Sequence, residues 1–135
     1  LDALKWAEGV GGLKGLIERS NANLKAVEQW VEKTAWAEFL PERVDIRSNT
    51  SICFKVVDPW LTSKDEESQR KVIKSVESTL DKEGVAFEIA NHRDAPPSFR
   101  LWGGATVETA DIKSVLEWIS WAYESVKSQE QAKAA

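Results

Sequence analysis

Cysteine, histidine and methionine are scarce in this chain of 135 residues. It has one cysteine, Cys53, one histidine, His92, and no methionine. A single cysteine excludes an internal disulfide framework and fits a reducing compartment, so we expect a cytoplasmic protein. One cysteine and one histidine do not supply the ligands of a common zinc site, and we expect no metal site. Cys53 lies in an apolar run and is interpreted as a buried strand thiol rather than a nucleophile.

An excess of positive charge and long apolar runs are also missing. The net charge is −4, whereas binding to nucleic acids or to anionic membranes normally needs a basic surface. We therefore expect no nucleic-acid partner and no membrane partner. No stretch approaches the roughly 18 apolar residues of a membrane span, and no signal-peptide pattern is present. A hydrophobic content of 42% and a charged content of 30% are ordinary for one globular domain.

The common nucleotide-binding loops have no counterpart here. The chain contains neither G-x-x-x-x-G-K-[ST] nor G-x-G-x-x-G. Gly11 and Gly12 follow a helical pattern rather than a strand, which makes a phosphate cradle a poor interpretation. The carboxylates of residues 65–67 fall in the first turn of a predicted helix, where they complement the helix dipole and need no acid–base role.

Tryptophan, by contrast, is abundant, with seven residues. Such large apolar side chains usually pack against other apolar surfaces, either in the same chain or in a neighbouring part of the protein. The sequence also starts at Leu1 in the middle of a helical pattern. We therefore expect a piece of a longer protein, in which some of the tryptophans contact parts outside this chain.

Helical periodicity predicts four main helices. Residues 1–10 and 13–33 form two of them, separated by the glycines at positions 9, 11 and 12. The second is expected to bury one apolar stripe, made of Leu13, Leu16, Ile17, Leu24, Val27 and Val31. A third helix starts with a capping-box pattern, Ser63 with Glu66, and ends at Gly84. A fourth starts at Thr109 and bears a long apolar face.

Branched and aromatic residues predict strands at 51–57, 85–90 and 98–102, with residues 36–47 as a loop. The first two strands enclose a helix, which is typical of a crossover unit, and the third returns beside the second. The predicted fold class is α/β (α+β). It has a small, mostly antiparallel sheet of about three strands with helices on one face.

The candidate site lies in residues 91–104, which hold two arginines, the histidine, two adjacent prolines and two adjacent glycines. Arg100 stands on a predicted strand between Phe99 and Leu101, an unusual place for a charge that only improves solubility. Its planar fork suits a carboxylate, while His92 and Arg93 on the preceding loop suit a second anion such as phosphate. The alternative is a proline-rich turn with solvated arginines. A further arginine, Arg47, is more typical of pairing with a local carboxylate.

Several segments together resemble the C-terminal part of phosphoserine aminotransferases. The segments are 4–7, 11–13, 47–54, 91–97 and 99–108, with the arginine–leucine–tryptophan–glycine–glycine run at 100–104 the most specific. The resemblance extends over essentially the whole chain. It implies a pyridoxal-phosphate enzyme of the aspartate aminotransferase fold type, with a large cofactor domain, a long helix and a small C-terminal domain. Residues 1–34 would then be connector helices from a missing large domain, and residues 35–135 the small domain.

The resemblance also implies an activity and a role for each cation. Such enzymes interconvert 3-phosphohydroxypyruvate plus glutamate with O-phosphoserine plus 2-oxoglutarate in serine biosynthesis, usually as homodimers. Arg100 would hold the substrate α-carboxylate. His92 and Arg93 would reach the substrate phosphate, although their spacing to Arg100 is one residue longer than in bacterial members.

The same resemblance places the chemistry elsewhere. The Schiff-base lysine, the aspartate that pairs with the pyridine nitrogen and the cofactor phosphate cup belong to the large domain of such enzymes. We therefore expect no catalytic and no cofactor-binding residue here, and a chain that alone neither binds pyridoxal phosphate nor catalyses transamination. Two alternatives stay open: the small domain of another aminotransferase, such as one acting on alanine and glyoxylate, or a stand-alone binding domain.

Overall fold

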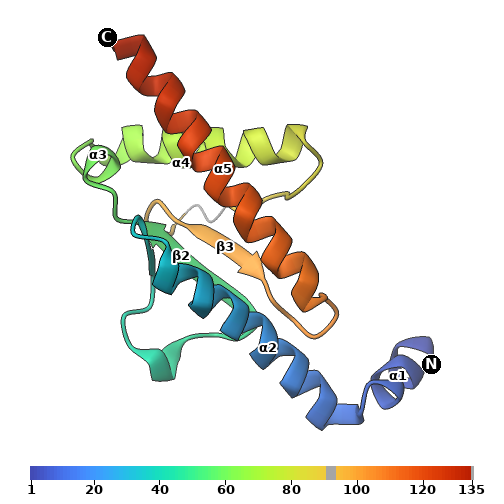
Figure 1. Ribbon diagram of the computed structural model, residues 1–135. Coiled ribbons are helices and arrows are strands. Elements are labelled where there is room, and N and C mark those ends of the chain that lie inside the picture. Colours follow the sequence, from blue (N-terminus) through green and yellow to red (C-terminus); the bar gives the residue numbers. More distant parts are fainter. Residues whose placement is uncertain (91–93, 135) are drawn as a thin grey trace.

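The computed structural model describes residues 1–90 and 94–134 (Figure 1). The helices are α1 (Asp2–Gly9), α2 (Gly12–Lys33), the short α3 (Pro59–Thr62), α4 (Glu66–Lys82) and α5 (Thr109–Ala134). The strands are β1 (Ala37–Phe39), β2 (Ser51–Val56) and β3 (Phe99–Trp102), and a single 3-10 turn, η1, covers Val44–Ile46. No helix in the described part of the chain is long and apolar enough to cross a membrane.

The three strands form one antiparallel sheet in the order β1-β2-β3. Residues alternate between its two faces, as the pleat of a strand requires. Ile52, Phe54 and Val56 of β2 point to the buried face, as do Phe99 and Leu101 of β3. This confirms the predicted fold class, a small antiparallel sheet combined with helices.

Helices cover only one face of the sheet. The helix α5 crosses in front of the strands in Figure 1, beside α2 and α4, with both of which it is in contact. The core between helices and sheet is rich in aromatic residues. Phe54, which is fully buried, lies 5.2 Å from Trp30 of α2 and 5.4 Å from Phe99, measured between ring centroids. The opposite face carries the alternate residues of the strands, which are Ser51, Cys53 and Lys55 of β2 and Arg100 and Trp102 of β3.

The predicted strand at 85–90 is wrong. Beside β3, this segment accepts one backbone hydrogen bond, from the Arg100 N–H to the Ile89 carbonyl at 2.7 Å, and forms no ladder. Glu88 has a φ of 55°, which interrupts an extended backbone. The N–H of Ala90 is bonded to the buried Glu77 carboxylate at 3.0 Å instead of to a neighbouring strand. The predicted crossover unit between 51–57 and 85–90 is also wrong, because 85–90 is not a strand and the strand that follows α4, β3, pairs with β2 antiparallel.

The third strand is β1, inside the stretch predicted to be a loop. Its pattern is too short to stand out, since only Ala37 and Phe39 point inward, with Glu38 between them. Pairing with β2 stabilises it. Backbone bonds from Val57 to Trp36 at 2.7 Å and from Leu40 to Cys53 at 3.0 Å extend that pairing on both sides.

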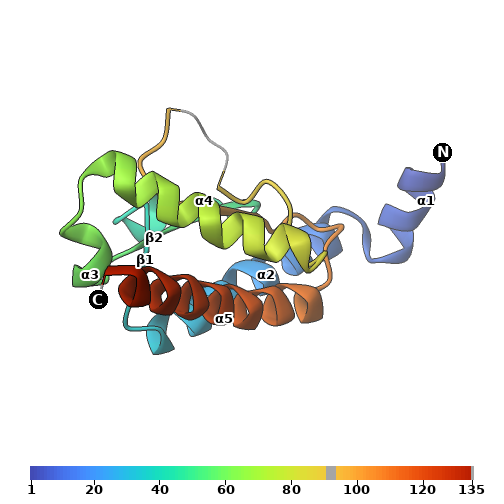
Figure 2. The ribbon, with the colours of Figure 1, turned by 90° about the horizontal axis from the view of Figure 1, so that it is seen from above.

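The two N-terminal helices and the glycine joint between them are confirmed. Gly11 and Gly12 adopt φ values of 101° and 64°, which are accessible to glycine without strain. A Cβ on Gly15 would lie 1.8 Å from the carbonyl oxygen of Val10, so the corner closes only over glycine. Every residue of α1 is at least partly exposed, and the helix projects away from the rest of the molecule (Figures 1 and 2).

The predicted apolar stripe of α2 is correct only in its second half. Val27 is fully buried, but Leu13 and Ile17 are 75% and 48% exposed. The first turns of α2 lie beyond the sheet (Figure 1), and these two side chains are largely uncovered by the described part of the chain. The tryptophans divide in the same way: Trp30 is buried, whereas Trp6, Trp102, Trp118 and Trp121 are each at least 40% exposed.

The start of α4 also differs from the predicted capping box. Asp65, not Ser63, is the N-cap residue, and its carboxylate accepts hydrogen bonds from the backbone N–H and the hydroxyl of Ser68 at 3.0 and 2.7 Å. Residues 59–62 form the separate helix α3, capped by Asp58. Pro59 at the first position of α3 starts a helix earlier than the apolar period indicates.

Candidate functional site

Arg100 lies on the open face of the sheet, away from the helices. In β3 the buried residues Phe99 and Leu101 alternate with the exposed residues Arg100 and Trp102, so the strand turns the guanidinium outward. Its partner across the ladder is Cys53 of β2. Cys53 is half-buried on this open face, and its prediction as a buried thiol is therefore wrong.

The guanidinium of Arg100 has no hydrogen-bond or ion-pair partner among the described residues. Its backbone is fixed nonetheless, because β3 pairs with β2 on one side and the Arg100 N–H bonds to Ile89 on the other. A guanidinium on a rigid strand has little backbone freedom to lose when it binds. The five N–H donors of such a group are suited to a planar anion.

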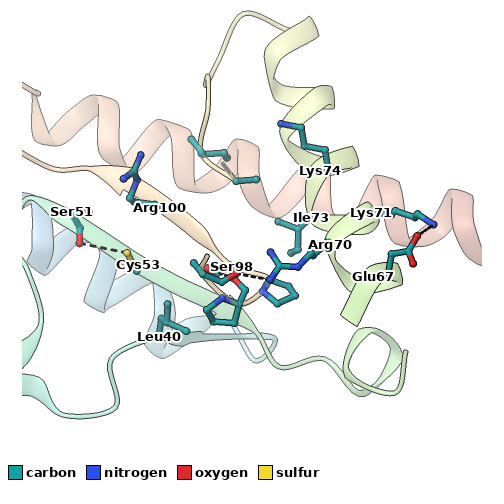
Figure 3. Close-up of a pocket in the computed structure, with 15 residues that line it drawn as sticks. Leu40, Ser51, Cys53, Glu67, Arg70, Lys71, Ile73, Lys74, Ser98 and Arg100 are labelled. Carbon is teal, nitrogen blue, oxygen red and sulfur yellow. Dashed lines mark hydrogen bonds and ion pairs between the residues drawn. The ribbon is translucent and has the colours of Figure 1, made fainter. Parts of the chain in front are cut away.

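A cavity of about 880 Å³ lies beside Arg100 (Figure 3). The sheet supplies one wall, α4 supplies another, and residues 89–90 and 95–98 supply a third. Figure 3 shows Arg100 on β3 at one side and the cations of α4 at the other. The polar side chains in its lining are Ser51, Cys53, Glu67, Arg70, Lys71, Lys74, Ser98 and Arg100.

The cations of α4 differ from Arg100 because each is already paired. Arg70 binds Glu66 at 2.6 Å, and Lys71 binds Glu67 at 2.7 Å. Lys74 forms an ion pair with the buried carboxylate of Glu77. The hydrogen bond and charge of Glu67 raise the pKa of Lys71, which keeps that ammonium protonated. Arg100 is therefore the best-placed cation in this lining to bind an external anion.

Residues 95–98, which line the cavity, are hydrogen-bonded to α4. Arg70 also donates a hydrogen bond to the Ala95 carbonyl at 2.7 Å, and the Ser98 hydroxyl donates to Pro96 at 2.8 Å. The two other predicted anion-binding residues, His92 and Arg93, lie outside the described residues. Their role therefore stays a prediction.

Arg47 does not pair with a carboxylate as its position had indicated. Its Nε donates to the Pro41 carbonyl at 3.2 Å, and its guanidinium lies 4.1 Å from the centre of the Phe39 ring. Both contacts fasten the loop between β1 and β2. Arg47 is thus a structural residue of the loop and takes no part in the cavity.

A metal site and a disulfide have no support in this region. Within residues 1–90 and 94–134, no group of three or more potential metal ligands gathers. Cys53 is unpaired, and its thiol contacts the Ser51 carbonyl at 3.8 Å. The arrangement can bind an anion at Arg100, and the paired acids and bases around it stabilise the walls of the cavity.

Two residues of α2, Asn23 and Arg19, stabilise the end of β3. Neither of them was predicted from the sequence. The side-chain amide of Asn23 donates to the carbonyls of Gly103 and Val107 at 3.0 and 3.1 Å. Arg19 donates to the Ala105 carbonyl at 2.6 Å and forms an ion pair with Glu108. One signal was present in the sequence: Asn23 falls on the same helical period as Leu16, Val27 and Trp30, where an apolar residue is expected.

Comparison with known proteins confirms the resemblance seen in the sequence. The chain is 50% identical over 127 residues to a phosphoserine aminotransferase of Methanosarcina barkeri, and 48% identical over 127 residues to one of Methanosarcina mazei. Both matches cover 94% of this chain but 32% of the relative. The chain therefore spans about a third of the length of these curated relatives. No family model matches it.

A solved structure shares the fold. The phosphoserine aminotransferase from Bacillus circulans subsp. alkalophilus aligns with a TM-score of 0.69 over 90% of this chain and 30% of that one. The sequence identity is 18%. This similarity establishes the fold of the chain as one found within an aminotransferase.

Proposed function

We propose that this chain is the C-terminal third of a pyridoxal-phosphate-dependent phosphoserine aminotransferase. In this proposal residues 1–34 are connector helices from a large cofactor domain, and residues 35–135 are the small domain. The observation that carries it is the 50% identity over 127 residues to one such enzyme, in a chain whose Arg100 lies on the open sheet face beside a cavity of about 880 Å³ and has no partner among the described residues. The assembled enzyme would interconvert 3-phosphohydroxypyruvate plus glutamate with O-phosphoserine plus 2-oxoglutarate.

The chain's contribution is to bind and orient the substrate. Arg100 holds the α-carboxylate through two parallel hydrogen bonds, which fixes the Cα–H bond in the orientation needed for proton removal. His92 and Arg93 bind the phosphate. A site built for a phosphate leaves its cations unpaired when a smaller substrate enters, and this penalty provides the selectivity.

The lysines of this cavity do not fit the covalent site of pyridoxal phosphate. A Schiff-base lysine needs an accessible neutral amine, whereas Lys71 and Lys74 are both in ion pairs with carboxylates of α4. The cofactor would be held by the part of the enzyme outside this chain. In this proposal the isolated chain is inactive. The complete enzyme, of which the chain is a part, is a cytoplasmic homodimer.

Replacing Arg100 by lysine in the complete enzyme should lower kcat/KM for phosphoserine by about 10- to 100-fold, or about 1.4–2.7 kcal/mol. Lysine keeps the positive charge but lacks the fork that holds both carboxylate oxygens. Steady-state kinetics with phosphoserine and 2-oxoglutarate measures the loss. Arg43→Lys is the matched control, because Arg43 is exposed and paired with Asp45 away from the cavity. Unchanged turnover in Arg100→Lys would reject the assignment.

Selection for phosphate is tested separately with the double variant His92→Ala, Arg93→Ala. We expect kcat/KM for phosphoserine to fall by about 100-fold or more, while the value for alanine or serine changes by less than about threefold. The ratio between the substrates is the measured quantity. An equal loss for all of them would mean that the two residues do not read the phosphate, and would favour an aminotransferase for small unphosphorylated amino acids.

A further inference from the structure

Two side chains of α2, Asn23 and Arg19, bind the turn that follows β3, and together they are called the bracket. Asn23 binds the carbonyls of Gly103, Gly104 and Val107 at 3.0, 3.3 and 3.1 Å. Its own oxygen accepts a hydrogen bond from the Thr109 hydroxyl at 2.7 Å. One helical turn earlier, Arg19 binds the Ala105 carbonyl at 2.6 Å and the carboxylate of Glu108. Residues 80 or more positions apart in sequence are thereby fixed to one another.

This bracket acts on the strand that carries Arg100. Gly103 follows Arg100 by three residues and continues β3 through a backbone hydrogen bond to Thr50 at 2.6 Å. The turn packs closely at both glycines, since a Cβ on Gly103 would lie 2.6 Å from Ile52 and one on Gly104 would lie 2.5 Å from the ring of Trp102. A movement of the turn relative to α2 would therefore pull on β3 and on Arg100.

Arg19 also reaches the first helix. Its guanidinium lies 5.7 Å from the centre of the Trp6 ring on α1, and its side chain is 26% exposed. One side chain thus joins α1, α2 and the turn between β3 and α5. The glycine corner at Gly11, Gly12 and Gly15 sets the angle between α1 and α2, so the three elements meet at a defined geometry.

We propose that Arg19 is a positioning residue for Arg100, which fixes the anion-binding strand relative to the connector helices α1 and α2. The inference rests on the proposed function and adds a residue outside the cavity to its substrate-binding apparatus. In the assembled enzyme the connector helices would carry the large domain. Arg19 then sets the distance between Arg100 and the reacting end of the substrate.

The test is Arg19→Met in the complete enzyme, which keeps an apolar side chain against Trp6 but removes both polar contacts. We expect KM for phosphoserine and for glutamate to rise by about fivefold, because the bound carboxylate is held less well. We expect kcat to fall as well, because the Cα–H bond is then less well oriented for proton removal. Lys14→Met is the matched control. Lys14 pairs with Glu18 on the same helix and has no part in the bracket, so its KM values should stay unchanged.

A double-mutant cycle separates positioning from general stability. If Arg19 acts through Arg100, the KM effect of Arg19→Met disappears in an Arg100→Lys background. A lower melting temperature without a change in KM, or an equal KM effect in both backgrounds, overturns the inference and leaves the proposed function intact. An Arg100→Lys variant with normal kinetics overturns both. The single variants are therefore measured before the cycle is interpreted.

Discussion

Replacing Asn23 by alanine should lower the free energy of unfolding by about 3–4 kcal/mol, one of the two largest effects we expect from a single substitution in this chain. Asn23 is fully buried and uses both ends of its amide. Truncation leaves three backbone carbonyls and the Thr109 hydroxyl with less than their normal hydrogen bonding, in a place that is buried at Gly103 and Gly104 and partly buried at Val107 and Thr109. Urea unfolding of the chain, followed by circular dichroism, measures the loss.

Asn21→Ala provides a close control for this measurement. Asn21 lies two residues earlier in α2, is exposed, and makes one hydrogen bond, with Asn49 at 2.8 Å. Both variants gain the same helix propensity, so the difference between them isolates the buried contacts. We expect Asn21→Ala to stay within about 0.5 kcal/mol of the parent. If Asn23→Ala were equally mild, the bracket between α2 and the turn after β3 would not contribute to stability.

The position of Arg100 was predictable because strand periodicity is a local property. Phe99 and Leu101 had to point into a core, and the arginine between them therefore had to point out of it. The cations of α4 were not predictable in the same way. Arg70, Lys71 and Lys74 look like an ordinary solvated helix face, and only the tertiary structure places them on the wall of the cavity.

The error at residues 85–90 has a different origin. The residues are apolar and branched, as in a strand, but their backbone hydrogen-bonding partners are decided by neighbours distant in sequence. Glu77 accepts the N–H of Ala90, and the positive φ of Glu88 turns the chain. β1 is the converse case, since Ala37–Phe39 has a weak pattern and is stabilised by β2. Strand propensity depends on such pairing more than helix propensity does.

The second large effect is expected at Asp58, which joins the end of β2 to the last helix. One carboxylate oxygen caps α3 by accepting the N–H of Trp60 at 2.9 Å. The other accepts hydrogen bonds from the Tyr123 hydroxyl at 2.8 Å and the Lys127 ammonium at 2.6 Å. Asp58→Ala removes the cap, a hydrogen bond to a fully buried tyrosine and a mostly buried ion pair. We expect it to cost about 3 kcal/mol of unfolding free energy, measured by urea denaturation at neutral pH.

Asp45→Ala is the control, because its carboxyl pairs with Arg43 in an exposed position. Arg43 holds the pKa of Asp45 below its usual range, and Asp58 also has a lowered pKa, so the pKa alone does not separate the two residues. Burial does: the Asp58 side chain is 11% exposed, whereas that of Asp45 is 65% exposed and water replaces its partner readily. The unfolding midpoint of Asp45→Ala should match that of the parent. A loss equal to that of Asp58→Ala would contradict this explanation.

The same carboxylate makes the free energy of unfolding depend on pH in the acid range, and Asp58→Asn should weaken this dependence. Burial alone would raise the pKa of Asp58, but the bonds from Lys127, Trp60 and Tyr123 outweigh it and lower the pKa from its ordinary value of 3.8. A lowered folded-state pKa contributes stability that is complete above the unfolded-state value and is lost as the pH falls through the folded-state value. The stability difference between the parent and Asp58→Asn should therefore be constant from pH 7 to about 5 and shrink below about pH 4. A difference that stays constant down to pH 3 would mean that the charge of Asp58 does not stabilise the fold, and that its hydrogen bonds act through geometry alone.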